Sequence, residues 1–178
     1  APDLGAAADQ MRTRRGLPSL PHEAYRRVAS SGARGLLGVA FDLQPDADGY
    51  EAYRQEFLLN YEQCLLQQTA PFVGVVDLLQ TLQHQGVPWG IVTNKAACFT
   101  EQIVCGLDAL HGAAVVISGD TMPHAKPHPA PLLEAARRME VAPQRCLYVG
   151  DDLRDMQAAR AAGMVGMAAV WGYLGGAA

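Results

Sequence analysis

The sequence has no apolar run long enough to span a bilayer, since a spanning helix needs about 20 consecutive apolar residues. It has no basic run large enough to offset its formal net charge of −4, and this charge argues against a nucleic-acid surface. The basic stretch MRTRRG is followed by polar residues and prolines in place of an apolar segment, so no secretory signal peptide is expected. We therefore expect a cytoplasmic protein with no membrane and no nucleic-acid partner.

The spacing of the cysteines shows no pattern. No CxxC pair and no accompanying histidine spacing connects the four cysteines, Cys64, Cys98, Cys105 and Cys146. This argues against a zinc site or a disulfide framework and favours reduced thiols. The composition, 49% hydrophobic and 18% charged in 178 residues, is that of a globular protein of one domain or of a domain with a small addition.

The first part of the chain carries helical periodicity only. The apolar residues of ARGLLGVAF recur at helical spacing, and so do those of YEAYRQEFLLNYEQCLL. Two stretches rich in turn formers, RRGLPSLP and DLQPDADG, interrupt this pattern. We therefore expect residues 1–68 to form a small all-helical unit.

Strands and helices alternate after TAPF. Short apolar strands are expected near residues 88–93, 113–118, 146–150 and 166–171, with helices between them. Such alternation predicts crossover connections, and therefore a parallel sheet with helices on both faces. The fold class that we predict is α/β, with a Rossmann-like core over residues 69–178.

Polar side chains follow these strands at the points where they end. The first strand ends in Thr93 and Asn94, the second leads to a loop with Lys126, and the third ends in Gly150 and Asp151. Ligands of such sheets bind at the carboxyl ends of the strands. A hydroxyl, an ammonium and carboxylates at one edge are suited to a phosphoryl group and a magnesium ion.

The stretch YVGDDLRD places three carboxylates within a few positions: Asp151, Asp152 and Asp155. A divalent cation turns their repulsion into coordination. The alternative is that these residues only stabilise the start of the next helix, where the dipole favours negative charge. Lys95 and Lys126 are the only lysines among 14 basic residues, which argues against a role as general surface charge.

VTN, AKPHP and YVGDDLRD, in this order and at these strand ends, resemble motifs two, three and four of the haloacid dehalogenase-like hydrolases. Within them the chain is similar to the phosphoglycolate phosphatase branch, over nearly its whole length. The resemblance implies a helical cap, which residues 1–68 fit, before most of the core. It implies a magnesium-dependent phosphatase for a small phosphorylated substrate, with 2-phosphoglycolate first. A sugar 6-phosphate such as N-acetylmuramic acid 6-phosphate is second, because SSGARGLLGVAF also resembles enzymes of that kind.

The resemblance also implies roles for single residues. Thr93 and the backbone of Asn94 are expected to hold phosphoryl oxygens, and Lys126 to neutralise the charge of phosphate and nucleophile. Asp151 is expected to be a magnesium ligand, direct or through water, and Asp155 to support the metal shell.

Two further residues carry weaker expectations. Asp152 stands where the family often has a small polar residue, so we expect it to act only indirectly. Arg34, in the expected cap, is a candidate contact for a substrate anion, and an exposed helix arginine is the alternative.

One departure from the family is large. Its first motif, DxDGT, supplies the aspartate nucleophile and the general acid/base, and it occurs nowhere in the 178 residues. We therefore expect the chain to lack the nucleophile and the central first strand of the sheet, and to be inactive on its own. A non-catalytic phosphate-binding protein remains a second reading. A phospho-receiver domain is disfavoured, because its acidic pair belongs to the first strand. As a complete protein we expect a monomer or a homodimer.

Overall fold

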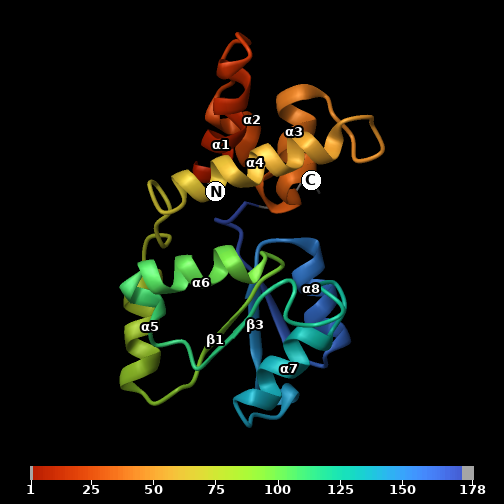
Figure 1. The fold of residues 1–178 in the computed structure, drawn as a ribbon. Coiled ribbons are helices and arrows are strands. Elements are labelled where there is room, and N and C mark those ends of the chain that lie inside the picture. The colour runs from red at the N-terminus through yellow and green to blue at the C-terminus, as the bar shows by residue number, and fades with distance from the viewer. Residues whose placement is uncertain (1, 174–178) are drawn as a thin grey trace. The chain divides into compact units, whose positions relative to one another are not determined.

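The computed structural model describes residues 2–173, which form two compact units (Figure 1). The first unit consists of residues 2–69 together with residues 170–173, and the second of residues 70–169. The first unit is helical. Its elements are α1 (Pro2–Arg14), α2 (His22–Arg26), the 3-10 turn η1 (Ala29–Ser31), α3 (Gly32–Phe41) and α4 (Tyr50–Cys64).

The core of the first unit lies where α1 packs against α3 and α4. Small residues on α1 let the helices approach closely, and larger apolar side chains from all three fill the centre. The fully buried residues there are Ala7, Ala8, Met11, Leu36, Leu37, Ala40 and Phe57. Those of α3 and α4 belong to the two stretches whose helical spacing the sequence displays, so the prediction of helices there is confirmed.

A buried carboxylate connects the two ends of the first unit's chain. Asp3, in the first turn of α1, is 1% exposed. Its carboxylate accepts hydrogen bonds from the backbone N–H of Gln68 (2.8 Å), and from the backbone N–H (3.0 Å) and hydroxyl (2.6 Å) of Thr69. The start of α1 is thereby fixed to the segment that leaves α4.

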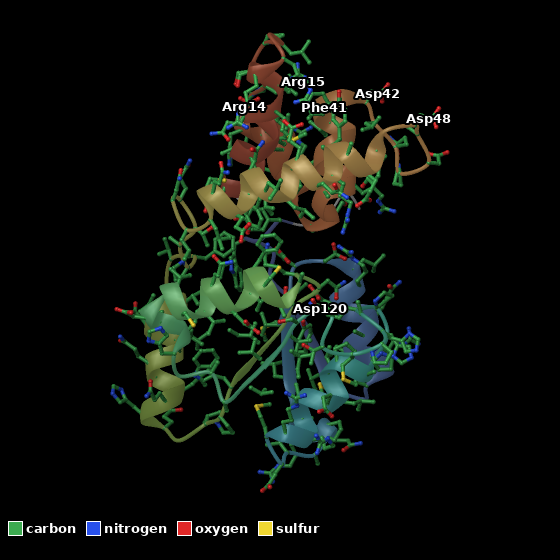
Figure 2. The ribbon with its side chains drawn as sticks, viewed as in Figure 1. Arg14, Arg15, Phe41, Asp42, Asp48 and Asp120 are labelled. Atoms are coloured by element: carbon green, nitrogen blue, oxygen red, sulfur yellow. The ribbon has the colours of Figure 1, made fainter. Side chains whose placement is uncertain are left out.

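Arg15 links α1's end to α3 and α4 near the surface (Figure 2). Its guanidinium lies 4.6 Å from the ring centroid of Tyr53 and 5.5 Å from that of Phe41. It also forms a two-pronged ion pair with Glu56, with N–O distances of 2.9 and 2.5 Å. A guanidinium can stack on rings and bind a carboxylate at the same time, because its donors lie in the plane of the group.

The second unit alternates strands with helices. The strands are β1 (Gly90–Val92), β2 (Val115–Ile117), β3 (Leu147–Gly150) and β4 (Val165–Ala168). The helices are α5 (Val75–His84), α6 (Ala97–Gly106), α7 (Ala130–Arg138) and α8 (Leu153–Ala161), with 3-10 turns η2 (Asp108–Leu110) and η3 (Pro143–Arg145). The predicted order of strands and helices is confirmed.

The four strands pair as two separate parallel sheets. β1 pairs with β2, with Gly90 opposite Val115, and β3 pairs with β4, with Leu147 opposite Val165. Parallel pairing is confirmed, but each strand is shorter than predicted. The predicted fourth strand ran to residue 171 because its sequence stays apolar, whereas β4 ends at Ala168 and residues 170–173 belong to the first unit.

Helices α7 and α8 cover one face of these strands. Leu132 of α7 packs with Ala158 and Ala159 of α8, and with Val92 of β1 and Tyr148 of β3. On the other face of the second sheet the apolar side chains are exposed: Leu147, Val149, Val165 and Met167. Since successive side chains of a strand point to opposite faces, one face of β3 is packed and the other is not.

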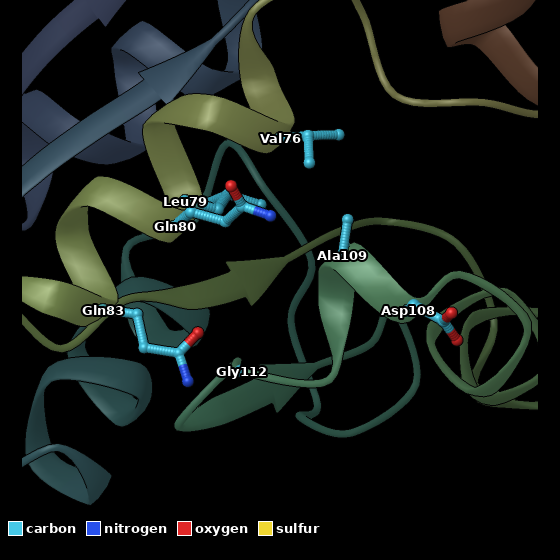
Figure 3. Close-up of a pocket in the computed structure, with 7 residues that line it drawn as sticks. All are labelled: Val76, Leu79, Gln80, Gln83, Asp108, Ala109 and Gly112. Carbon is cyan, nitrogen blue, oxygen red and sulfur yellow. The ribbon is translucent and has the colours of Figure 1, made fainter.

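Three findings complete the description of the chain. All four cysteines are free, as predicted. No helix among residues 2–173 has both the length and the apolar character needed to cross a bilayer. A pocket lies between α5 and η2 (Figure 3), and it is lined by Val76, Leu79, Gln80, Gln83, Asp108, Ala109 and Gly112. None of the predicted site residues lines it.

Candidate active site

The carboxyl end of β1 presents the hydroxyl of Thr93. The Thr93 N–H donates to the Ile117 carbonyl (2.9 Å), which continues the pairing of β1 with β2 by one residue. The chain then turns, and the Lys95 N–H donates to the Thr93 hydroxyl oxygen at 3.1 Å. A hydroxyl that accepts one bond still has its own proton to donate. Thr93 is thus suited to bind a phosphoryl oxygen.

Asn94 joins this turn to the Lys126 loop. Its side-chain nitrogen Nδ2 donates to the Lys126 carbonyl at 2.9 Å, and its Oδ1 accepts the Lys126 backbone N–H at 2.9 Å. The side chain is therefore engaged with the protein. The backbone of Asn94 is the part to which the sequence assigned the substrate contact.

The Lys126 ammonium contacts three polar groups of the second unit. It is 2.8 Å from Asp155 Oδ1, 2.8 Å from the Tyr148 hydroxyl and 3.0 Å from the Val92 carbonyl. An ammonium has three N–H donors, so these three acceptors match them. The side chains of Lys126 and Asp155 are only 10% and 7% exposed. Their charges are thus paired and largely removed from water.

Asp155 holds the turn between β3 and α8. Its Oδ2 accepts the backbone N–H groups of Asp151 and Asp152, each at 3.1 Å. With Asp152 as the N-cap this forms a reciprocal capping box at the start of α8. Gly150 has to be glycine here, because a Cβ at this position would overlap the Asp155 side chain. The predicted stabilisation of a helix start by these acidic residues is therefore present.

Asp152 is engaged with Arg154. One carboxylate oxygen accepts the Arg154 backbone N–H at 2.9 Å, and both oxygens accept guanidinium N–H groups at 2.7 and 2.9 Å. The Asp152 hydrogen bond raises the pKa of Arg154 above its ordinary value. These contacts give Asp152 a structural part at the helix start, in keeping with the indirect role expected of it.

Lys95, the second lysine, is half-buried beside the same turn. Its ammonium lies 6.0 Å from the ring centroid of Phe99 on α6. Burial lowers the pKa of Lys95 to about 8, and the nearby Cys98 offsets this only in part. Its carbonyl accepts the Gly119 N–H at 2.7 Å and the Thr100 hydroxyl at 3.2 Å, which fixes the backbone of the turn.

The structure thus connects most of the predicted site residues. A chain of contacts leads from Thr93 through Lys95 and Asn94 to Lys126, and on through Asp155 to the backbone of Asp151. All of them belong to the second unit. Arg34 belongs to the first, where it is exposed on α3.

A magnesium site was predicted at Asp151 and Asp155. Carboxylate oxygens suit this ion, which prefers six oxygen ligands. Asp151 is half-buried at the end of β3, but Asp155 is already bound to Lys126 and two backbone N–H groups. Within residues 2–173, no group of three or more His, Cys, Asp or Glu side chains is arranged to hold a metal ion. The carboxylate of Asp151 thus fits magnesium in donor type and can supply part of its shell, whereas both oxygens of Asp155 are bound within the protein.

Tyr148 is a site residue that the sequence did not suggest. Its hydroxyl lies 3.0 Å from the Val92 carbonyl and 3.4 Å from Asp155 Oδ1, next to the Lys126 ammonium. Burial, and then the charge of Asp155, raise the pKa of the phenol well above its ordinary value. A tyrosine in an apolar strand is expected to be a packing residue, and its neighbours Leu147 and Val149 are apolar as well, so the sequence holds no signal that Tyr148 faces the site.

Comparison with known proteins identifies the family. Residues 6–169 match the family described as haloacid dehalogenase-like hydrolase. The chain is 48% identical over 173 residues to a phosphoglycolate phosphatase of Xanthomonas campestris pv. campestris. This match covers 97% of this chain and 78% of that protein. It is 38% identical over 174 residues to an N-acetylmuramic acid 6-phosphate phosphatase of Pseudomonas putida, covering 98% of this chain and 78% of that protein.

A solved structure is similar over the same extent. It is described as a predicted phosphoglycolate phosphatase from Haemophilus somnus, with a TM-score of 0.83 and 25% identity. The match covers 97% of this chain and 80% of that one. The resemblance seen in the three sequence motifs is therefore confirmed, and the chain belongs to the haloacid dehalogenase-like hydrolases, within which it is similar to the phosphoglycolate phosphatase branch.

Proposed function

We propose that this protein is part of a magnesium-dependent phosphatase that hydrolyses a small phosphate monoester, with 2-phosphoglycolate as the first candidate. The observation that carries the proposal is the network that joins the Thr93 turn, the Lys126 ammonium and the Asp155 carboxylate at the ends of β1 and β3. The 48% identity to a phosphoglycolate phosphatase supports the substrate.

Each group has a part in phosphoryl transfer. The Thr93 hydroxyl and the Asn94 backbone N–H donate to phosphoryl oxygens, and the Lys126 ammonium offsets the charge that develops on them. An aspartate oxygen attacks phosphorus as the bond to the leaving oxygen breaks, and water then hydrolyses the aspartyl-phosphate. We expect that aspartate to come from the family's first motif, which the 178 residues do not contain.

The same segment should complete the sheet. The described strands form two separate parallel pairs, and a further parallel strand between them would pair with both and bring its aspartate to the carboxyl edge. Residues 1–178 without that segment should be inactive.

Asp151 is the residue that we assign to magnesium. When bound, the ion supplies positive charge to the phosphoryl oxygens. Asp155 stabilises this site indirectly, because it accepts a hydrogen bond from the Asp151 backbone and pairs with Lys126. Asp151 and Asp155 lie at opposite ends of one turn, so the helix start and the site depend on the same hydrogen bonds.

Residues 1–68 serve in this proposal as the cap, and Arg34 as its contact for the substrate's non-reacting anion. The 38% identity to an N-acetylmuramic acid 6-phosphate phosphatase supports a second candidate substrate, a phosphorylated amino sugar acid. Both candidates carry a carboxylate besides the phosphate, so an arginine is a suitable partner for either.

The complete protein tests the proposal. It should hydrolyse 2-phosphoglycolate faster than N-acetylmuramic acid 6-phosphate, with a requirement for magnesium. Asp151→Asn should remove nearly all magnesium-dependent turnover, whereas Asp152→Asn, the matched control, should mainly lower stability. If the complete protein binds phosphate but turns over neither ester, it is the non-catalytic protein instead. If Asp151→Asn keeps normal activity at saturating magnesium, the metal assignment is wrong.

Arg34 has a separate test. Arg34→Ala should raise KM for a carboxylate-bearing substrate far more than for a neutral aryl phosphate. An equal effect on both substrates would reduce Arg34 to a surface residue of α3.

A further inference from the structure

The side chain of Asn94 forms two hydrogen bonds with the backbone of a single residue, Lys126. It donates through Nδ2 to the Lys126 carbonyl and accepts the Lys126 N–H through Oδ1, both at 2.9 Å. The two residues are 32 positions apart. Because the two bonds use both ends of the amide, they fix the Lys126 main chain in position and in orientation.

The loop that carries Lys126 needs such a contact. Residues 119–129, between β2 and α7, lie outside the described helices and strands. Within it the Thr121 N–H bonds to Ser118 and the His128 N–H to Ala125, which are local turns. The Asn94 amide is therefore what connects the backbone at Lys126 to the end of β1.

Asn94 itself stands on a rigid support. A Cβ at Gly119 would overlap the Asn94 carbonyl, so the two backbones are in close contact. The Gly119 N–H also donates to the Lys95 carbonyl at 2.7 Å, and the Thr93 N–H to Ile117. The turn at residues 93–95 thus cannot shift without breaking its bonds to β2 and the residues after it.

The ammonium of Lys126 is fixed at its other end by Asp155, Tyr148 and the Val92 carbonyl. We propose that the side chain of Asn94 is a positioning residue for Lys126, setting where its ammonium stands relative to the Thr93 hydroxyl. This inference rests on the proposed function. It gives Asn94 two roles. Its backbone N–H binds the phosphoryl group, and its side chain positions the loop of residues 119–129 that carries Lys126.

The test uses Asn94→Ala in the complete protein, with 2-phosphoglycolate and magnesium. Displacing a catalytic group by about 1 Å can cost up to about 100-fold, so kcat should fall between about 10- and 100-fold, with KM changed less than about threefold. Asp120→Ala is the matched control. Asp120, labelled in Figure 2, accepts the Ala97 N–H through Oδ1 at 2.9 Å, so it joins the same two segments by one exposed hydrogen bond. That bond involves neither Thr93 nor Lys126. It should leave kcat unchanged.

A double variant separates positioning from general loosening. If Asn94 acts through Lys126, Asn94→Ala should lower kcat no further in a Lys126→Ala background. Losses that multiply in the double variant would overturn the inference, and so would a normal kcat in Asn94→Ala.

Hydrogen exchange gives a readout that does not depend on turnover. The Lys126 amide proton should exchange at least about tenfold faster in Asn94→Ala than in the wild type, and at the wild-type rate in Asp120→Ala. Unchanged exchange at Lys126 overturns the inference. If exchange rises as expected while the wild-type protein is inactive on both esters, the proposed function fails and the contact between Asn94 and Lys126 is retained.

Discussion

The helical unit buries its large apolar side chains, whereas the strand-bearing unit leaves many of its own exposed. Met11, Leu36 and Phe57 of the first unit are at most 1% exposed, while Leu147 and Val165 of the second are 53% and 62% exposed. A helix satisfies its own backbone hydrogen bonds and needs only one covered stripe. A two-stranded sheet has two edges and two faces, and here α7 and α8 cover one face only.

The difference extends to charge. The second unit places an ion pair, Lys126 with Asp155, close to its packed face, and the first unit uses a single buried carboxylate, Asp3, to join two chain segments. Order in the second unit should therefore depend more on electrostatic pairing. The predictions below test this difference, from the largest expected effect to the smallest.

Loss of the central ammonium should have the largest effect. Lys126→Met leaves Asp155 buried without its cation, and breaking a buried pair from one side costs about 3–5 kcal/mol. Chemical denaturation should show this loss, with faster hydrogen exchange in α8 and β3. Arg154→Met, which breaks the more exposed pair with Asp152, should cost about 1 kcal/mol or less. Equal losses in both variants would contradict the central place of Lys126.

The elements of both units could be predicted from the sequence because periodicity and turn residues specify them locally. The end of α5 is an example, because Gly86, two residues after the helix, has a positive φ of 66° and donates to the Gln83 carbonyl, and glycine is the residue that adopts this conformation most easily. The pairing that connects distant segments could not be predicted in this way. The bond from Asn94 to Lys126 spans 32 positions, and no local pattern encodes it.

The candidate site shows the same division. Strand ends identified Thr93, Lys126 and Asp151 as neighbours, because parallel strands bring their carboxyl ends to one edge. The sequence could not distinguish an aspartate that faces a metal from one that binds a lysine. Asp155 is the example, since its carboxylate is bound to Lys126 and to the backbone of its own turn.

The burial of Lys95 should make the second unit more stable as the pH rises from 8 towards 10. Its folded-state pKa of about 8 lies below the ordinary 10.5, so between these values the unfolded chain holds a proton that the folded chain has lost. The burial penalty is thus complete below pH 8 and is relieved as pH rises. Lys95→Met should be more stable than the wild type at pH 7 by about 1–3 kcal/mol, allowing for partial exposure, and this difference should shrink towards pH 10.

The measurement is the difference in unfolding free energy between wild type and Lys95→Met from pH 7 to 10. Raised pKa values of Cys64 and Cys146, which burial causes, act in both proteins and cancel in the difference. A difference that does not change with pH would show that the ammonium is solvated in the folded protein.

Removing the buried carboxylate of the first unit should have a moderate effect. Asp3→Ala leaves the Thr69 N–H and hydroxyl and the Gln68 N–H without their acceptor. Unsatisfied buried donors cost about 1–3 kcal/mol. Thermal denaturation should show the loss, and exchange should rise at the start of α1 and at residues 68 and 69. Asp48→Ala, on the exposed loop before α4 (Figure 2), is the control and should change stability by less than about 0.5 kcal/mol.

The smallest effect should come from the surface pair of Arg15 and Glu56. The two side chains are 32% and 34% exposed, and exposed pairs contribute about 0.2–1 kcal/mol. The Arg15 hydrogen bond, partly opposed by burial, holds the pKa of Glu56 below its ordinary 4.5. This stabilisation is therefore present above pH 4.5 and is lost as pH falls through the lower, folded-state value. Glu56→Gln should be less stable than the wild type at pH 7 and equal to it near pH 2, and added salt should reduce the difference at pH 7.

In Glu56→Gln, Arg15 would still lie on the rings of Phe41 and Tyr53, so Arg15→Ala should cost more stability than Glu56→Gln. If the two variants lose the same free energy, the rings contribute nothing and the ion pair alone holds Arg15.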